Sequence, residues 1–335
     1  MKAIVVRGFP PHERVEFGDI ADPVAEPGEV VVDLAAIDVN YPDILYMEGK
    51  YQDTPALPFV PGLAGAGRVS VLGEGASSFS VGQKVLVLPL CGTYAEKVRV
   101  PEAWCFPMPN DMPFETGAAF GLVYQTAYFA LIRRGGFREG DRVLVLGSSG
   151  GVGMAAVQLA RAMGARTVMA ATRGPIGRSF ADRLGADVVI DSAMENLRDG
   201  LKDAVIEATG GHGADIVIDP VGGAIHAAAL RAMAWSGRMV VVGFASGDIP
   251  KIASNYLLVK NIAAMGLQWT DYRSREPEAV AAAQAAMFGL WSQDKLNPIV
   301  SRTLPLARYE EGLSALGSGG ACGKSNFIPP ATWEY

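Results

Sequence analysis

Between residues 142 and 244 the chain repeats one pattern, in which a short apolar run is followed by about 10–15 residues with helical spacing. The apolar runs are RVLVLG (142–147), TVMAAT (167–172), DVVID (187–191), ADIVID (214–219) and RMVVVGF (238–244). They lack the alternation of apolar and polar residues, which is typical of parallel strands buried on both faces of a sheet. The repeat therefore predicts an α/β fold with a doubly wound parallel sheet.

The flanking residues have a different pattern. From residue 1 to about 110, β-rich runs are separated by Gly, Pro and Asp turns, which predicts an antiparallel sheet or a small barrel. A helix is expected over 114–134, and short strands return near the C-terminus. A chain of 335 residues is long for one core. We therefore predict a β-rich domain over 1–122, a domain built on the parallel sheet over 123–264 and a return to the first domain over 265–335.

The composition limits the environment and the partners. No run of about 18 uncharged apolar residues is present, so we expect no membrane span, and the first residues lack the features of a signal peptide. The net charge of −6 and the dispersed basic residues argue against nucleic acid as a partner. Three cysteines, far apart at Cys91, Cys105 and Cys322, suit a reducing compartment, so the expected location is cytoplasmic.

The stretch LGSSGGVGMAAVQLA (146–160) joins the first apolar run to its helix. Glycines allow a sharp turn and a close approach of the backbone to a pyrophosphate, while the helix N-terminus supplies N–H donors and the positive end of a dipole. The same spacing occurs in ordinary strand–helix turns, but its place at the head of the βα series favours dinucleotide binding. The candidate contacts in this loop are Gly147, Ser149, Gly150, Gly151 and Val152.

The residues after the second apolar run indicate which dinucleotide binds. A fold that prefers NAD places Asp or Glu about 20 residues after the glycines, where the side chain holds the ribose hydroxyls. Residues 171–178 read ATRGPIGR and contain no acid, and Thr172, Arg173 and Arg178 stand there instead. Arginine binds phosphate through paired hydrogen bonds, so we predict NADPH, with a preference of roughly 10- to 100-fold over NADH. The alternative is that both arginines are solvated residues at the start of a helix.

The chain offers few ligands for a catalytic metal. Zinc needs Cys, His or carboxylate ligands that converge on one point. The histidines are His12, His212 and His226, and no two cysteines have a C-x-x-C spacing. We expect His212 and His226 at the surface, and no bound metal. A conjugated acceptor can take hydride from a nicotinamide without a Lewis acid, because the acceptor itself delocalises the arriving charge.

Motifs spread along the whole chain are similar to those of one family. They are NYPDILYMEGKY (40–51), LPFVPGLAGAG (57–67), GSSGGVG (147–153), DPVGG (219–223), GFASG (243–247), NYLLVKN (255–261) and the pair Gly323 and Lys324. With them the chain resembles the zinc-independent quinone oxidoreductase branch of the medium-chain dehydrogenase/reductase superfamily. The resemblance implies a GroES-like β-barrel catalytic domain, a Rossmann domain with a cofactor cleft between the two, and a homodimer formed through the Rossmann edge strand near residues 238–247. The positions of two zinc ligands in related dehydrogenases fall here at Asn40 and Leu63.

The resemblance also implies roles for single residues. Asn40, Asp43, Tyr46 and Tyr51 should lie at the nicotinamide end of the cofactor. The other implied contacts are Gly150 to Val152 under the pyrophosphate, Thr126 beside the nicotinamide, Phe244 and Ser246 on its flank, and Lys324 near the C-terminus. Tyr51 is the candidate proton donor, and Asn40 is the candidate for orienting the substrate oxygen or the nicotinamide amide. Each has a structural alternative: Tyr51 caps a loop, Tyr46 packs, and Asp43 bonds within the first turn of its helix.

Three functions are compatible with these residues. The first is reduction of a quinone by NADPH, in one- or two-electron steps. The second is reduction of the double bond in an α,β-unsaturated carbonyl or enoyl thioester, and the third is NADPH binding with little turnover. An enoyl-thioester enzyme should offer a basic entry for a phosphopantetheine or nucleotide tail, and no clear basic cluster is visible. We therefore predict an NADPH:quinone oxidoreductase.

Overall fold

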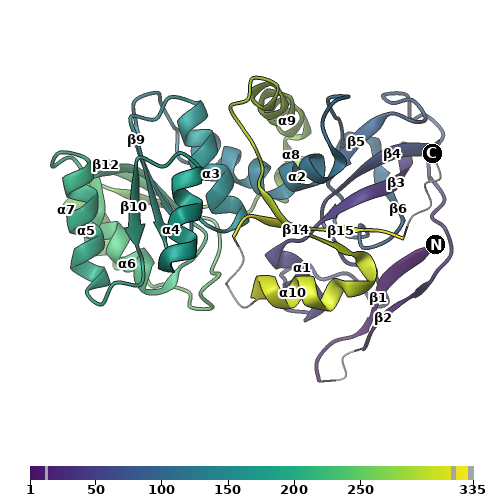
Figure 1. Ribbon diagram of the computed structural model, residues 1–335, viewed down its shortest axis with the longest axis horizontal. Helices are drawn as coiled ribbons and strands as arrows, with labels where there is room; N and C mark the ends of the chain where they lie inside the picture. Colours follow the sequence, from purple (N-terminus) through teal and green to yellow (C-terminus); the bar gives the residue numbers. More distant parts are fainter. Residues whose placement is uncertain (12–13, 318–321, 331–335) are drawn as a thin grey trace. The chain divides into compact units, whose positions relative to one another are not determined.

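The computed structural model describes residues 1–11, 14–317 and 322–330, so His12 lies outside the described residues. The chain divides into two compact units (Figure 1). Unit 1 comprises Met1–Leu122, Tyr272–Phe288 and Pro298–Tyr335, and unit 2 comprises Val123–Asp271 and Gly289–Asn297.

Unit 2 takes in residues 265–271 and 289–297, which the predicted domain ranges assign to the C-terminal return. The second segment is held by Gln158 of unit 2. Its side-chain nitrogen donates to the Asn297 carbonyl at 2.8 Å, and its side-chain oxygen accepts from the Asn297 N–H at 2.8 Å. These partners are 139 residues apart in sequence, so no local pattern indicates the pairing.

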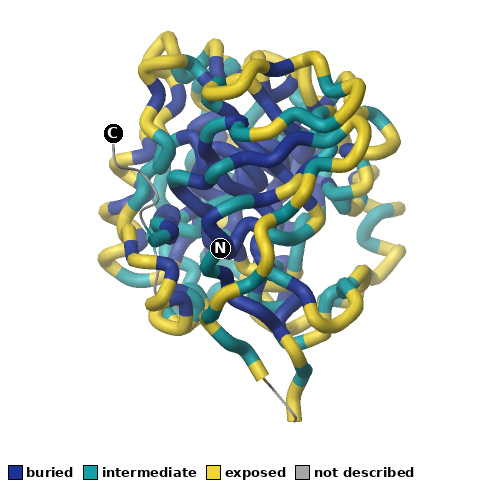
Figure 2. The backbone as a smooth tube through the Cα atoms, turned by 90° about the vertical axis from the view of Figure 1, so that its right-hand side faces the viewer, coloured by how far each residue is buried: buried dark blue, intermediate teal, exposed yellow. Residues whose placement is uncertain are grey.

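Unit 1 is built around a seven-stranded sheet. Its strands are β3 (Glu29–Asp38), β4 (Gly65–Leu72), β5 (Lys84–Val87), β6 (Lys97–Pro101), β7 (Cys105–Pro107), β14 (Val300–Pro305) and β15 (Lys324–Ile328). Their order is β14-β15-β3-β4-β5-β7, and β6 also pairs with β3. A separate hairpin consists of β1 (Lys2–Gly8) and β2 (Arg14–Asp19). Strands β3, β4 and β5 are largely buried, whereas β2 and β14 are mostly exposed or half-buried (Figure 2).

The helices of unit 1 connect and follow these strands. They are α1 (Tyr41–Met47), α8 (Tyr272–Arg275), α10 (Tyr309–Gly317), and the longer α2 (Phe114–Phe129) and α9 (Pro277–Trp291), each of which continues into residues of unit 2. The helix predicted over 114–134 is present, but its last turn, Ala130–Arg134, is π-helical. Helix α1 begins where Asn40 caps it in an extended conformation, with a proline in its first turn.

Unit 2 contains a six-stranded parallel sheet, which confirms the predicted fold class. Its strands are β8 (Arg142–Leu146), β9 (Thr167–Thr172), β10 (Val188–Asp191), β11 (Ala214–Asp219), β12 (Met233–Val241) and β13 (Ala263–Gly266). Their order is β10-β9-β8-β11-β12-β13, and every neighbouring pair is parallel. The order reverses between β8 and β11. Open α/β sheets bind ligands at such a switch point, beyond the carboxyl ends of the strands.

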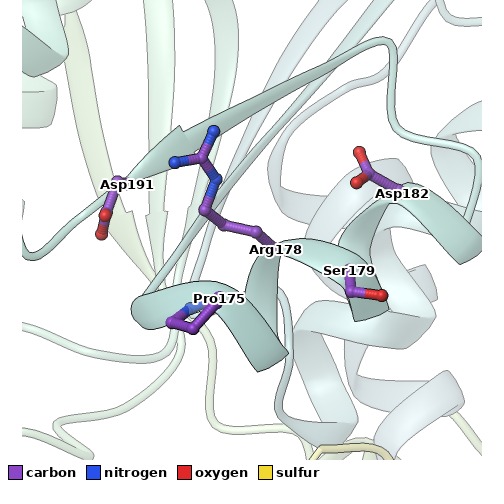
Figure 3. Close-up of a pocket in the computed structure, with 5 residues that line it drawn as sticks. All are labelled: Pro175, Arg178, Ser179, Asp182 and Asp191. Carbon is purple, nitrogen blue, oxygen red and sulfur yellow. The ribbon is translucent and has the colours of Figure 1, made fainter.

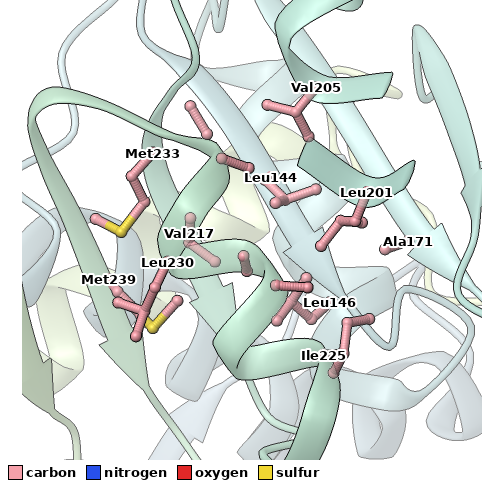
Figure 4. Close-up of a cluster of buried hydrophobic side chains, with 14 of the residues drawn as sticks. Leu144, Leu146, Ala171, Leu201, Val205, Val217, Ile225, Leu230, Met233 and Met239 are labelled. Carbon is pink, nitrogen blue, oxygen red and sulfur yellow. The ribbon is translucent and has the colours of Figure 1, made fainter. Parts of the chain in front are cut away.

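The helices of unit 2 are α3 (Gly151–Ala162), α4 (Gly174–Arg183), α5 (Leu197–Ala208), α6 (Gly223–Ala232) and α7 (Ser254–Lys260). Helices α5 and α6 cover one face of the sheet (Figure 4). The buried cluster there includes Leu201 and Val205 of α5, Ile225 and Leu230 of α6, and Leu144 and Val217 of the sheet. Burial of each such large side chain contributes about 1.5–3 kcal/mol to the stability of the fold, so this layer holds α5 and α6 against the sheet.

Two strands differ from the predicted pattern. Strand β12 begins at Met233 and ends at Val241, whereas the apolar run suggested 238–244. Strand β13 was not predicted, because its residues Ala-Ala-Met-Gly are small, partly exposed and without a β-branched side chain. Its parallel pairing with β12 is what makes it a strand.

Among the helices of the described residues, none has both the length and the apolar character that crossing a membrane requires.

Candidate active site

The phosphate loop lies at the switch point of the unit 2 sheet. Strand β8 ends at Leu146, and α3 begins at Gly151 with Gly150 as its N-cap. The turn between them is tight, since Gly147 has a φ of +61° and its carbonyl accepts the Gly150 N–H at 3.1 Å. The first N–H groups of a helix have no partner within it, so an anion at this end of α3 meets donors and the positive end of the helix dipole.

Gly153 and Gly150 of this loop differ in how much space surrounds them. At Gly153 an added Cβ would lie 2.2 Å from the Gly147 carbonyl oxygen and 2.6 Å from the Ser148 Cα, so only glycine lets α3 pack this closely. At Gly150 the nearest atom to such a Cβ is the Gly147 oxygen at 3.5 Å, which is an ordinary contact. Packing therefore requires Gly153, whereas Gly150 leaves space beside the loop that a phosphate could use.

Thr172 ends β9 and is joined to the phosphate loop. It is 2% exposed, and its hydroxyl donates to the Ser149 hydroxyl oxygen at 3.1 Å. An added Cβ at Gly177 would lie 2.4 Å from the Thr172 hydroxyl oxygen, so α4 also approaches closely. Thr172 thus lies at the carboxyl end of the second strand of the sheet and orders the loop through Ser149.

The two predicted phosphate-binding arginines lie at α4. Arg173 is the N-cap of this helix, and both Arg173 and Arg178 are exposed. An open depression of about 350 Å³ is lined by Arg178 with Pro175, Ser179, Asp182 and Asp191 (Figure 3). Asp191 ends β10 and pairs in register with Thr172 of β9, which places its carboxylate near Arg178. The sequence of β10 alone does not indicate that Asp191 and Arg178 are neighbours.

The turn after β11 contains a buried carboxylate. Asp219, the last residue of β11, is fully buried, and its Oδ1 accepts the N–H groups of Val221 and Gly222 at 2.9 Å each. Its Oδ2 lies 2.7 Å from Nδ1 of His226 in α6. The prediction that His226 lies at the surface is wrong, since it is 1% exposed. Helix α6 starts immediately after the turn, which directs its first-turn side chain back under the strand end.

The other described histidine, His212, has a side chain that is 44% exposed, as predicted, with its Nε2 at 2.7 Å from Asp215 Oδ1.

Phe244 and Ser246 lie in the turn after β12, which bonds to the turn after β11. The Ala245 N–H donates to the Pro220 carbonyl at 3.1 Å, and the Ser246 N–H donates to the Val221 carbonyl at 3.0 Å. Both Phe244 and Ser246 are exposed. They therefore lie at the same carboxyl edge of the sheet as the phosphate loop.

In unit 1 a buried polar cluster forms where β3 ends. The Lys324 ammonium donates to the Val39 carbonyl at 2.7 Å and to Asn40 Oδ1 at 2.9 Å, and it lies 3.2 Å from Asp38 Oδ2. Strand β15 pairs antiparallel with β3, which brings Lys324 beside the link from β3 to α1. Lys324 is 4% exposed, so its ammonium is directed at these three oxygens.

Asp43 completes this cluster from the first turn of α1. Its Oδ2 accepts the Asn40 backbone N–H at 2.8 Å and the Tyr94 hydroxyl at 2.9 Å, and the carboxyl is fully buried. Burial raises the pKa of Asp43 to about 7. Burial also raises the pKa of Asp38 to about 6, against the opposing charge of Lys324. The structure thus brings Asn40, Asp43 and Lys324 together, and it adds Asp38 and Tyr94, which the sequence analysis did not single out.

Tyr46 and Tyr51 form a stacked pair, with ring centroids 4.6 Å apart and an interplanar angle of 23°. Tyr46 is 3% exposed and Tyr51 is half-buried. Burial raises the pKa of Tyr46 to about 12, so this phenol stays protonated at neutral pH. Thr126, the remaining predicted contact, is buried in the part of α2 that belongs to unit 2.

Among the described residues, no group of three or more His, Cys, Asp or Glu side chains is arranged to hold a metal ion. Asn40 and Leu63, at the positions of zinc ligands in related dehydrogenases, are both buried.

Comparison with known proteins identifies the family. The model described as a zinc-binding dehydrogenase matches residues 151–285, and the one described as an alcohol dehydrogenase GroES-like domain matches residues 26–110. A quinone oxidoreductase-like protein 2 homolog of Nematostella vectensis is 34% identical over 299 residues, which cover 88% of this chain and 80% of the relative. The quinone oxidoreductase of Homo sapiens is 32% identical over 328 residues, or 97% and 96% of the two chains.

A solved structure agrees with these relatives. The quinone oxidoreductase from Thermus thermophilus, whose structures include a complex with NADPH, is 32% identical to this chain. It superimposes with a TM-score of 0.83 and covers 98% of this chain and 100% of its own. The chain therefore belongs to the quinone oxidoreductase branch of the medium-chain dehydrogenase/reductase superfamily of oxidoreductases.

Proposed function

We propose that this protein is an NADPH:quinone oxidoreductase that acts without a metal. The observation that carries the proposal is the fixed orientation of the Asn40 side chain in unit 1. Further support comes from the phosphate loop at the switch point of the unit 2 sheet and from relatives named as quinone oxidoreductases, one of them solved with NADPH.

Asn40 is held so that its amide nitrogen can donate to an acceptor. An ammonium group has no lone pair to offer, so the Asn40 oxygen has to face Lys324 and the NH₂ group faces the other way. One hydrogen of this NH₂ group is directed to the Asp38 carbonyl at 3.5 Å, and we assign the second to a bound acceptor. A quinone that receives hydride develops negative charge on its oxygen, and a donor that is already in place stabilises that charge without reorganisation. We therefore assign Lys324 to the positioning of Asn40 rather than to direct contact with the cofactor.

Asp43 has a supporting role in the proposal. Its carboxyl is enclosed and bonds to the Asn40 N–H and to the Tyr94 hydroxyl, so it holds the first turn of α1 and with it Asn40. Tyr51 is the candidate proton donor, because it is the more exposed phenol of the stacked pair. Reduction is complete when one hydride and one proton have reached the quinone, which leaves as the hydroquinone.

Unit 2 supplies the proposed cofactor contacts, and NADPH supplies the hydride when bound. Residues 147 and 149–152 would hold the pyrophosphate, with Thr172 ordering Ser149. Arg173 and Arg178 would bind the 2′-phosphate, although Asp191 and Asp182 reduce the positive potential in the depression that Arg178 lines. The nicotinamide contacts proposed from the resemblance are Thr126, Phe244 and Ser246 of unit 2, together with Tyr46 of unit 1.

The test follows NADPH oxidation by the purified, chelator-treated protein with 9,10-phenanthrenequinone as acceptor and NADH as the control donor. We expect turnover with NADPH and at least about tenfold lower kcat/KM with NADH, since one charge-assisted contact is worth about 1.5–3 kcal/mol. Equal use of NADH would contradict the roles of Arg173 and Arg178. If the protein binds NADPH but reduces no acceptor, it is a cofactor-binding protein with little turnover and the proposed activity is wrong.

The half-buried Tyr51, the more accessible phenol of the stacked pair, favours one second candidate, the reduction of an α,β-unsaturated carbonyl. A carbon that becomes a C–H centre needs a positioned proton donor, whereas the oxygens of a reduced quinone exchange protons with water. Tyr51→Phe therefore separates the two reactions. If 2-hexenal is the better acceptor and Y51F lowers only its reduction, by about 10²-fold, the enal is the preferred substrate class. Tyr41→Phe, at a nearby tyrosine that is 37% exposed, is the matched control.

We also propose that the protein is a homodimer formed through the edge of the unit 2 sheet at β13. This strand ends the sheet order beside β12. Large apolar side chains are exposed nearby in sequence, with Trp235 at 72%, Leu258 at 78% and Val259 at 75%. An edge strand is a template for pairing with a second chain.

A further inference from the structure

We infer that His226 positions the nicotinamide half of the cofactor, acting through Asp219 and the two turns at the carboxyl edge of the unit 2 sheet. The inference rests on the proposed function in one respect, which is the placement of Phe244 and Ser246 beside the nicotinamide.

His226 and Asp219 form a buried pair with a defined direction. Asp219 Oδ1 already accepts two backbone N–H groups, so the carboxyl group acts as an acceptor. The imidazole nitrogen that faces Oδ2 at 2.7 Å therefore carries the hydrogen and donates it. Nε2 of the same ring is buried and has no hydrogen-bond partner among the described residues. The polar contact of this ring is thus directed to Asp219.

The carboxylate shapes the turn over residues 219–223. Gly222 and Gly223 have φ values of +72° and +60°, which glycine adopts without a Cβ penalty. An added Cβ at Gly222 would lie 2.7 Å from the Asp248 carbonyl oxygen, and the Gly223 N–H donates to the same oxygen at 3.1 Å. The turn is therefore pressed against the turn that follows β12.

The second turn is anchored to the residues that Asp219 holds. The carbonyl of Val221, whose own N–H bonds to Asp219, accepts the Ser246 N–H, and the neighbouring Pro220 carbonyl accepts the Ala245 N–H. A continuous series of hydrogen bonds thus runs from His226 through Asp219 and Val221 to the backbone of Ser246, one of the two proposed nicotinamide contacts in this turn. All of these residues lie in unit 2.

Packing alone does not account for a histidine at this position. A buried polar atom without a partner lowers stability, and Nε2 of His226 is such an atom among the described residues. Its neighbours along α6, Ile225, Ala228 and Ala229, are apolar and buried. An apolar side chain would pack among them without an unpaired nitrogen but would leave Asp219 Oδ2 without its donor, so the contact that distinguishes His226 is the one to Asp219.

The experiment compares three substitutions of His226. In His226→Asn the amide nitrogen is as many bonds from Cβ as Nδ1, so it can donate to Asp219. In His226→Gln the amide nitrogen corresponds instead to Nε2, and in His226→Leu no donor remains. Thermal melts of the three variants establish whether each is folded. If H226L is not folded, H226Q takes its place as the variant that cannot donate to Asp219.

The readout is the dissociation constant for two ligands, NADPH and 2′,5′-ADP, which lacks the nicotinamide half. We expect H226L and H226Q to bind NADPH about tenfold more weakly, a change of about 1.4 kcal/mol, because the hydrogen bond from residue 226 to Asp219 is lost. Both should bind 2′,5′-ADP within about twofold of the unchanged protein. H226N should resemble the unchanged protein with both ligands.

Three results would overturn the inference: equal weakening of both ligands, unchanged NADPH binding despite a lower melting temperature, or identical behaviour of H226N and H226L. The proposed function is tested separately, because a protein that binds NADPH but reduces no acceptor would fail that proposal while this comparison of two affinities would still be decided.

Discussion

Asn40 links a buried structural cluster to the proposed chemistry. Its side-chain oxygen accepts from Lys324 and its side-chain nitrogen donates to the Asp38 carbonyl at 3.5 Å, so two neighbours fix the direction of its amide. We expect Asn40→Leu to lower kcat for quinone reduction by about 10²-fold, as the loss of one preorganised donor typically does. The NADPH dissociation constant should change little. Steady-state kinetics and a fluorescence titration measure the two quantities.

Asn326 provides the control for this substitution. It is also a fully buried asparagine of unit 1, and its side-chain nitrogen donates to the Glu115 carbonyl at 2.8 Å. Asn326→Leu should lower stability, because the carbonyl loses its donor, while folded N326L keeps kcat. If both variants lose kcat equally, the effect belongs to the fold and not to a donor at Asn40.

Asp43 should make stability depend on pH. Burial raises its pKa from 3.8 to about 7, so the unfolded chain releases its proton at a lower pH than the folded protein does. Folding stability should therefore fall as the pH rises from about 4 to about 7. Asp43→Asn should remove the part of this loss that Asp43 causes, while Asp38, whose pKa burial raises to about 6, keeps its own part. Between pH 5 and pH 8 we expect D43N to gain about 2–3 kcal/mol relative to the unchanged protein in urea unfolding.

The exposed Asp53 of the same unit is the matched acid. Asp53→Asn should leave the pH dependence of unfolding as it is in the unchanged protein. A D43N protein that loses stability relative to the unchanged one at pH 8 would contradict the assigned direction of the shift.

The turn from β8 to α3 combines two requirements, close packing and a free approach. An added Cβ at Gly153 would meet backbone atoms that cannot move aside, so Gly153→Ala should destabilise the protein by about 1–3 kcal/mol, as overpacking does. Gly150→Ala meets only an ordinary contact and should cost less than about 1 kcal/mol, the usual size of an N-cap change. It should nevertheless weaken NADPH binding at least tenfold, because its methyl group occupies space that the pyrophosphate needs. Chemical denaturation and NADPH titration of both variants test this, and unchanged binding by G150A would place the phosphate elsewhere.

At the edge of the unit 2 sheet, the proposed dimer makes a prediction for the assembled protein. Leu258→Glu combined with Val259→Glu would place two charges beside β13 and should shift the sedimentation coefficient from that of a dimer to that of a monomer. Val81→Glu in unit 1, at a site that is 65% exposed, is the control and should leave the assembly unchanged. If the protein without substitutions already sediments as a monomer, the proposed homodimer is wrong.

The sequence predicts those parts of the two-unit organisation that depend on neighbouring residues. Continuous apolar runs and helical spacing are properties of neighbouring residues, and the strands β8, β9 and β11 appear where those runs predict them. The glycine-rich turn is partly local, since Gly153 packs against Gly147 and Ser148, whereas Gly147 itself packs against Val221, which is distant in sequence. Strand β13 escaped prediction because its pairing with β12, and not its own residues, makes it a strand.

Single residues of the candidate site could be predicted from the sequence, but the contacts between them could not. Asn40 and Lys324 could each be named from motifs, yet their hydrogen bond joins positions 284 residues apart, which only the pairing of β15 with β3 brings together. The burial of His226 likewise depends on how α6 meets the end of β11, and the sequence around it suggested the opposite. Local sequence thus specifies which groups are present and which elements carry them. The long-range packing of strands and helices decides which of those groups meet and lose their water, and therefore which way each of them can donate a hydrogen bond.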